Sequence, residues 1–127
     1  MQFLFRYANP AQFMRLSDAA LPLLVAATLL AFAVGLYLGL TVPPDYQQGD
    51  SVRIMFLHVP AATAATTVYG AIAVCSILSL VWRHPLSDTA ARAAAPFGAL
   101  FTALGLVTGA IWGKPMWGTW WVWDARL

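Results

Sequence analysis

Three long stretches without a charged residue constrain the fold of this chain more than any other feature. They extend over residues 21–40, 60–82 and 93–112. A helix of about 20 mostly apolar residues is long enough to cross the hydrocarbon core of a bilayer. Because the chain is also 61% hydrophobic and only 9% charged, an ordinary water-soluble domain is excluded. The sequence predicts an all-α, polytopic membrane helix bundle with three transmembrane helices, which form a single membrane domain over residues 1–127.

Prolines indicate where the predicted helices begin and end. Pro43 and Pro44 directly follow the first stretch and are expected to end its helix, since proline cannot continue a helical hydrogen-bond ladder. Pro60 suits the first turn of the second helix, where a missing N–H costs nothing. His58 is therefore expected at the membrane edge, just before that helix begins.

Glycines inside the stretches predict close packing between helices. Small residues four positions apart let helix backbones approach each other in lipid. Gly35 and Gly39 have this spacing, as do Gly105, Gly109 and Gly113.

Three crossings place the loop 41–59 and the tryptophan-rich segment 112–127 on one side of the membrane, opposite the N-terminus. Basic residues are slightly more numerous on the N-terminal side, which favours a cytoplasmic N-terminus. These residues are Arg6, Arg15, Arg83 and Arg92, against Arg53, Lys114 and Arg126 on the other side. The net charge of +2 fits membrane flanks and does not indicate a nucleic-acid partner.

Five of the six tryptophans lie in the segment 112–127, at Trp112, Trp117, Trp120, Trp121 and Trp123. Tryptophan gathers at membrane interfaces, so an anchoring aromatic belt is one interpretation. The other is a flat wall for a planar ligand. If the chain after Gly118 is helical, Trp117, Trp120, Trp121 and Asp124 fall on one stripe of the helix. A belt needs neither this density nor an acid at its end, so we favour the ligand wall.

Haem is the planar ligand that fits these residues best. Its macrocycle can stack on indole rings, and its iron takes an axial nitrogen, for which His58 is the only histidine on that side. Its propionates require cations, which Lys114, Arg126 and Arg53 can supply. Asp124 is expected to orient the aromatic wall rather than to contact the iron. His84 lies on the opposite side and is expected to be a loop histidine.

The same residues carry a resemblance to a known family. The strings P-P-D-Y-Q-Q-G, R-I-M-F-L-H-V-P-A-A and W-G-K-P-M-W-G-T-W-W-V-W-D-A-R-L resemble cytochrome c maturation protein C, also called haem exporter protein C. Part of the third string resembles the tryptophan-rich signature of haem-handling membrane proteins. This resemblance covers the whole chain.

The resemblance implies a multi-pass protein of the bacterial inner membrane, with a cytoplasmic N-terminus and with the loop 41–59 and the segment 112–127 in the periplasm. It implies non-covalently held, b-type haem, with His58 as an axial ligand. The haem platform would comprise Trp117, Trp120, Trp121, Trp123 and Asp124. Haem would be delivered to a haem chaperone, cytochrome c maturation protein E. The implied partners are the ABC transporter subunits A and B and the small membrane protein D of the same system.

One departure from the family concerns length. Members are about twice as long, with six spans and a second periplasmic histidine beyond the tryptophan segment. This chain is therefore expected to be a fragment, a truncated product, or one part of a protein whose remainder is a separate polypeptide. It is expected to lack the second axial ligand and to bind haem weakly alone.

The sequence contains no Walker A loop, zinc-protease motif or nucleophile elbow, so we expect a binding and delivery protein rather than an enzyme. Three alternatives remain. A cytochrome c haem lyase would share the tryptophan motif. A quinone or b-haem redox subunit would normally place histidines within its spans. A membrane scaffold would use the tryptophans only as a belt.

Overall fold

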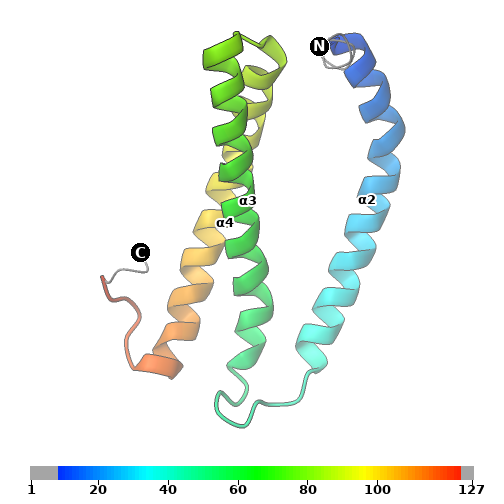
Figure 1. Cartoon of the computed structure of the whole chain (residues 1–127). Helices are drawn as coiled ribbons and strands as arrows, with labels where there is room; N and C mark the ends of the chain where they lie inside the picture. Colours follow the sequence, from blue (N-terminus) through cyan, green and yellow to red (C-terminus); the bar gives the residue numbers. More distant parts are fainter. Residues whose placement is uncertain (1–8, 124–127) are drawn as a thin grey trace. The chain divides into compact units, whose positions relative to one another are not determined.

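The computed structural model describes residues 9–123 of the chain, and in this part it is helical, with no strand. Three helices follow one another: α2 (Pro10–Thr41), α3 (Val52–Trp82) and α4 (Pro85–Trp117) (Figure 1). Each is long and apolar enough to cross a membrane. The predicted all-α membrane fold with three spanning helices is therefore confirmed. The helices extend beyond the predicted spans, whose boundaries in a bilayer stay a prediction.

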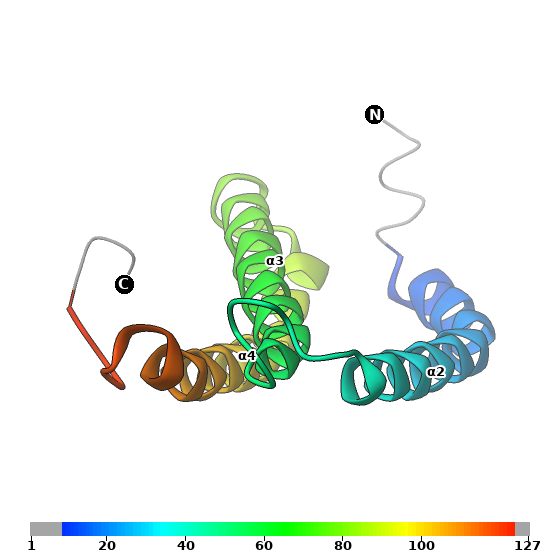
Figure 2. The same ribbon diagram turned by 90° about the horizontal axis from the view of Figure 1, so that it is seen from below.

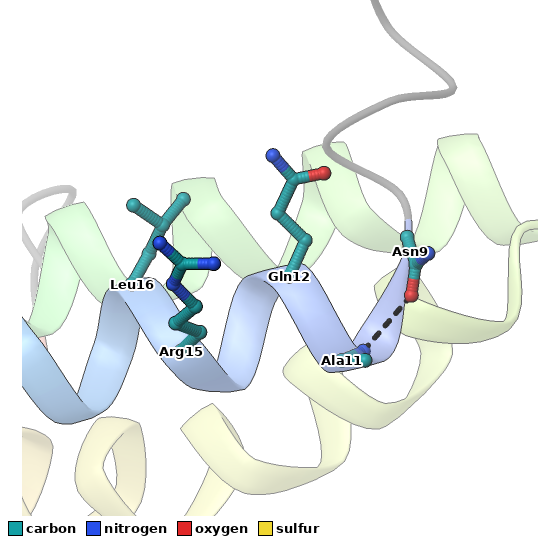
Figure 3. A pocket seen from close by; sticks show the side chains of 5 residues that line it. All are labelled: Asn9, Ala11, Gln12, Arg15 and Leu16. Atoms are coloured by element: carbon teal, nitrogen blue, oxygen red, sulfur yellow. Dashed lines mark hydrogen bonds between the residues drawn. The ribbon is translucent and has the colours of Figure 1, made fainter.

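The chain forms two compact units, Met1–Leu40 and Thr41–Leu127. In the first unit, Asn9 caps α2, because its side-chain Oδ1 accepts a hydrogen bond of 3.0 Å from the backbone N–H of Ala11. Figure 3 shows this contact beside the side chains of Gln12, Arg15 and Leu16, which line a shallow hollow on the first turns of the helix. The helix ends at Thr41, ahead of Pro43 and Pro44 as predicted.

In the second unit, α3 and α4 form an antiparallel helical hairpin and lie side by side in both views (Figures 1 and 2). The turn between them is short, with Arg83 in the left-handed region at φ 50°. His84 then caps α4 through its ring Nδ1, which accepts from the backbone N–H of Ser87 at 3.3 Å. The prediction of a loop position for His84 is confirmed.

Glycines of α4 let the two helices of the hairpin approach closely. A Cβ added at Gly98 would lie 3.3 Å from Val68, and one at Gly105 would lie 3.7 Å from the backbone of Ala62. Gly109 faces His58. Along these three contacts the residue numbers increase in α4 and decrease in α3, as expected for antiparallel helices. One face of α4 therefore packs on α3 over several turns. By contrast, a Cβ at Gly35 of α2 would meet nothing within 4 Å.

The start of α3 corrects the sequence prediction. The helix begins at Val52, so Pro60 lies inside it and His58 is a helical residue, not a residue that precedes the helix. The segment between Val52 and Pro60 is mostly apolar and has no residue that stops a helix. Pro60 removes a single N–H donor, whereas an unwound segment of that length would leave many backbone groups to be satisfied in an apolar setting.

The end of α4 corrects a second expectation. Gly118 has φ 77°, and its N–H donates to the carbonyl of Lys114 at 3.0 Å, which closes the helix. Residues 119–123 are not helical. The helical stripe of Trp117, Trp120 and Trp121 therefore does not form. Asp124, its fourth member, lies outside the described residues.

Candidate functional site

The N-terminal turns of α3 and the C-terminal turns of α4 meet at one end of the hairpin, together with the loop 41–51 (Figure 1). A pocket of about 720 Å³ opens here, which is within the usual range for small-molecule sites. Apolar residues of α3 and α4 contribute to its lining: Ala62, Ala65, Phe101, Leu106 and Ala110. His58 and four tryptophans line it as well. The end of the hairpin thus combines a potential metal ligand with an apolar cavity.

His58 is held against α4 by its Nδ1 atom. This nitrogen lies 3.0 Å from the backbone carbonyl oxygen of Gly105 and 3.2 Å from the hydroxyl oxygen of Thr108. The carbonyl can only accept a hydrogen bond. The Thr108 hydroxyl donates its own proton to the carbonyl of Leu104 at 2.6 Å, so it too must accept from the imidazole. Nδ1 therefore carries the proton.

A proton on Nδ1 leaves the lone pair of the neutral imidazole on Nε2. Nε2 has no hydrogen-bond partner in the described part of the chain, and His58 lines the pocket. A histidine that donates one ring N–H to a carbonyl and presents the other nitrogen to a cavity has the usual arrangement of a metal-binding histidine. The geometry therefore makes Nε2 of His58 the atom best placed to bind a metal.

Gly109 provides the space for this ring. A Cβ at Gly109 would lie 2.9 Å from Cε1 of His58 and 3.3 Å from its Nδ1. Side chains larger than glycine would therefore press on the imidazole.

Four tryptophans contribute an aromatic wall to the pocket. Trp112 stacks on His58, with 6.2 Å between ring centroids and 22° between planes. Trp117 meets Trp112 edge to face at 5.0 Å. Because Gly118 turns the chain, Trp120 and Trp121 also line the pocket, and they are 57% and 37% exposed. The wall therefore offers indole surface that nothing in the described part of the chain covers.

Trp123 does not line the pocket. It is 83% exposed and makes an edge-to-face contact with Trp121 at 5.4 Å. The structure thus brings four of the predicted tryptophans to the pocket and leaves Trp123 beside them.

Of the predicted cations, Lys114 lies beside the wall, and neither Lys114 nor Arg53 lines the pocket. Nζ of Lys114 donates to the carbonyl of Gly118 at 3.0 Å and lies 5.9 Å from the centre of the Trp120 ring. Arg53 pairs with Asp50 at 3.3 Å and donates to the carbonyl of Val42 at 3.2 Å. Arg126 lies outside the described residues. A role of these residues toward propionates stays a prediction.

The loop 41–51 supplies a contact that sequence reasoning missed. The indole N–H of Trp112 donates to the side-chain Oε1 of Gln48 at 3.0 Å. Gln48 belongs to the P-P-D-Y-Q-Q-G string, which the sequence analysis identified, but its contact with Trp112 was not predicted. Thr108 and the close fit at Gly109 were missed as well. The i, i+4 spacing of Gly105 and Gly109 was the available signal, since it identifies the face of α4 that meets His58.

Comparison with known proteins shows a family for this chain. The family model described as heme exporter protein C matches residues 3–127. Heme exporter protein C of Bradyrhizobium diazoefficiens is 56% identical over 120 residues, which cover 94% of this chain and 46% of that protein. For the protein of Paracoccus denitrificans the identity is 52% over 124 residues, 98% of this chain and 52% of the relative. Heme exporter protein C of Escherichia coli K12 is 46% identical over 125 residues, which cover 98% of this chain and 51% of that protein. The chain spans about half the length of these curated relatives.

Proposed function

Because the chain belongs to the heme exporter protein C family, we propose that it binds haem in the pocket of the α3–α4 hairpin, with Nε2 of His58 as an axial ligand. The relatives are named for haem export, which describes transport rather than an enzymatic reaction. The observation that carries the proposal is the contact of Nδ1 with the Gly105 carbonyl. A carbonyl oxygen only accepts, so this contact leaves the lone pair of the neutral ring on Nε2, and His58 lines an aromatic pocket.

The residues present fit a haem group in two respects. A porphyrin has broad apolar faces, and the pocket is lined by indole rings of Trp112, Trp117, Trp120 and Trp121 and by apolar side chains of α3 and α4. Imidazole is a common axial ligand of haem iron. When bound, haem supplies an iron that accepts the nitrogen ligand and two propionates that require cations or solvent.

The chain's own residues then act by binding and orientation. Gly105 and Thr108 hold the His58 ring through its Nδ1 atom, Gly109 leaves room for it, and the tryptophans offer indole surface to the ligand. We propose Lys114 and Arg126 as propionate partners, since Lys114 lies over the ring of Trp120. Arg53 is a weaker candidate, because its guanidinium already binds Asp50 and Val42.

We further propose that the chain lies in the bacterial inner membrane, with the pocket at the periplasmic face and the N-terminus in the cytoplasm. The held haem would pass to a haem chaperone, cytochrome c maturation protein E, during biogenesis of c-type cytochromes. The ABC transporter subunits A and B and the small membrane protein D would be its partners. Family membership and the shared end of α3 and α4 support this placement.

A titration of the purified chain in detergent or nanodiscs with ferric haem tests the proposal, with absorbance as the measurement. The chain should bind haem with the spectrum of a nitrogen-ligated iron. His58→Ala should weaken binding by more than about tenfold, because even partners beyond the ligand shell are worth about 10–100-fold in metal affinity. Replacing both Trp120 and Trp121 by alanine should weaken binding while the protein still inserts into membranes.

His84→Ala is the matched control, because it removes the other histidine of the chain at the opposite end of the hairpin. It should leave the spectrum unchanged. Equal spectra for the unmodified chain and His58→Ala would contradict the proposed ligand. Unchanged haem affinity in the double tryptophan variant would instead show that the indoles serve only as an interfacial belt.

A further inference from the structure

The side chain of Gln48 holds a tryptophan of the aromatic wall from outside the two helices. Its amide oxygen, Oε1, lies 3.0 Å from Nε1 of Trp112. An indole N–H can only donate, so the amide must present its oxygen and not its nitrogen to this ring. Gln48 and Trp112 are both half-buried. The contact therefore orients the plane of Trp112 in a partly dry setting, where hydrogen bonds are stronger than in water.

Gln48 is itself held by a short hydrogen-bonded turn. The Asp45 carboxylate oxygen Oδ1 accepts from the backbone N–H groups of Gln47 and Gln48, both at 2.9 Å. Backbone bonds between Asp45 and Gly49 close the turn, and Gly49 adopts φ 57°. The hydroxyl of Ser51 donates to the carbonyl of Gln48. Because the backbone of Gln48 is fixed on both sides, only side-chain freedom is lost when its amide binds Trp112.

Trp112 in turn touches the residues that matter most in the pocket. Its ring stacks on His58, and the edge-to-face contact joins it to Trp117. A rotation of Trp112 would therefore move one wall of the pocket and remove support from the imidazole. A chain of contacts thus runs from the turn at Asp45 through Gln48 and Trp112 to His58.

We propose that Gln48 is a positioning residue of the haem site, which acts through Trp112 to set the orientation of His58 and of the aromatic wall. The inference rests on the proposed haem function. It assigns a role in the site to the loop 41–51, which contributes no residue to the pocket lining.

Gln48→Leu tests the inference, since leucine keeps similar bulk and removes the acceptor. Haem affinity should fall roughly three- to tenfold, the range expected for one lost hydrogen bond, and the absorbance spectrum of the bound haem should change. Gln48→Glu keeps an acceptor at the same reach and should restore most of the affinity and the spectrum. Gln47→Leu is the matched control. Its side chain is exposed and makes no hydrogen bond in the described part of the chain.

Two further measurements separate this inference from the proposed function. The Trp112 indole N–H signal of the haem-free, ¹⁵N-labelled protein, assigned with Trp112→Phe, should shift in Gln48→Leu and stay in place in Gln47→Leu. In the Trp112→Phe background, Gln48→Leu should have no further effect on haem affinity. An unmoved indole signal, or equal haem binding by Gln48→Leu and Gln47→Leu, would overturn the positioning role. Failure of the unmodified chain to bind haem would overturn both proposals, while the indole signal would still report the contact.

Discussion

A histidine can serve as a metal ligand only when one ring nitrogen keeps its lone pair and faces open space. In a membrane helix the other nitrogen must also find a partner, because an unsatisfied N–H is costly in an apolar setting. Gly105 and Thr108 meet this second need for His58, since both accept from Nδ1. The carbonyl of Gly105 belongs to the backbone and cannot be removed by substitution. Thr108 is therefore the partner of Nδ1 that a substitution can remove.

Thr108→Val should weaken haem binding by about three- to tenfold. The substitution removes one of two acceptors for the His58 proton, and a hydrogen bond of this kind contributes about 0.5–1.5 kcal/mol. Haem titration of the purified chain measures the effect. Thr108→Ser keeps the hydroxyl and should bind haem as the unmodified chain does. Equal affinities for the valine and serine variants would show that the Gly105 carbonyl alone controls the imidazole.

At the scale of the helices, the hairpin depends on one glycine-lined face of α4. Gly98, Gly105 and Gly109 each bring α3 atoms within 3.7 Å of where a side chain would begin. In lipid there is little hydrophobic force between helices, so such close van der Waals contact is a main source of helix association. The fit is tightest at Gly109, where packing of the helices and placement of His58 coincide.

Gly109→Ala should therefore impair both stability and haem binding. The added Cβ would lie 2.9 Å from Cε1 of His58, and insertion of an extra carbon into a packed interface typically costs about 1–3 kcal/mol. Thermal unfolding in detergent and haem titration measure the two effects. Gly35→Ala is the matched control, since the space around Gly35 is open and alanine favours a helix. Equal unfolding temperatures for the two variants would contradict this account of α4.

Particular residues show what the sequence could and could not predict about these elements. Charge-free stretches identify spanning helices because the bilayer demands length and apolarity. With three crossings, the segment before the second helix and the segment after the third lie on the same side. The number of crossings alone therefore predicts that His58 and the tryptophans share one side of the membrane. The predicted start of α3 was wrong. The preference of proline for the first turn of a helix was given more weight than the mostly apolar segment ahead of Pro60. The hydrogen-bond partners of His58 and Trp112 could not be predicted from the sequence. These bonds depend on the rotation of each helix about its axis and on the conformation of the turn at Asp45, and the hydrophobic pattern of the sequence contains neither.

At the scale of the whole molecule, the chain is a multi-pass membrane protein with three helices of spanning length. Three crossings would place the two ends of this chain on opposite sides of the membrane. The small excess of arginine on the N-terminal side predicts which end is cytoplasmic.

Reporter fusions should place Met1 in the cytoplasm and Leu127 in the periplasm. A phosphatase that is active only in the periplasm and a fluorescent protein that matures only in the cytoplasm measure the two sides. A fusion at Arg83, in the turn between α3 and α4, should report the cytoplasm and serves as an internal control. Both ends in one compartment would contradict the three-span topology.

The turn between α3 and α4 also bears on how the protein is made. Only Arg83 and His84 separate the two helices, and every residue that lines the pocket belongs to these helices or to the segment after α4. Contacts between neighbouring segments of a chain form quickly, because little loop entropy is lost. As the ribosome delivers α4 to the membrane, it can fold back directly on α3. We therefore expect the pocket to form during insertion, when α4 packs against α3.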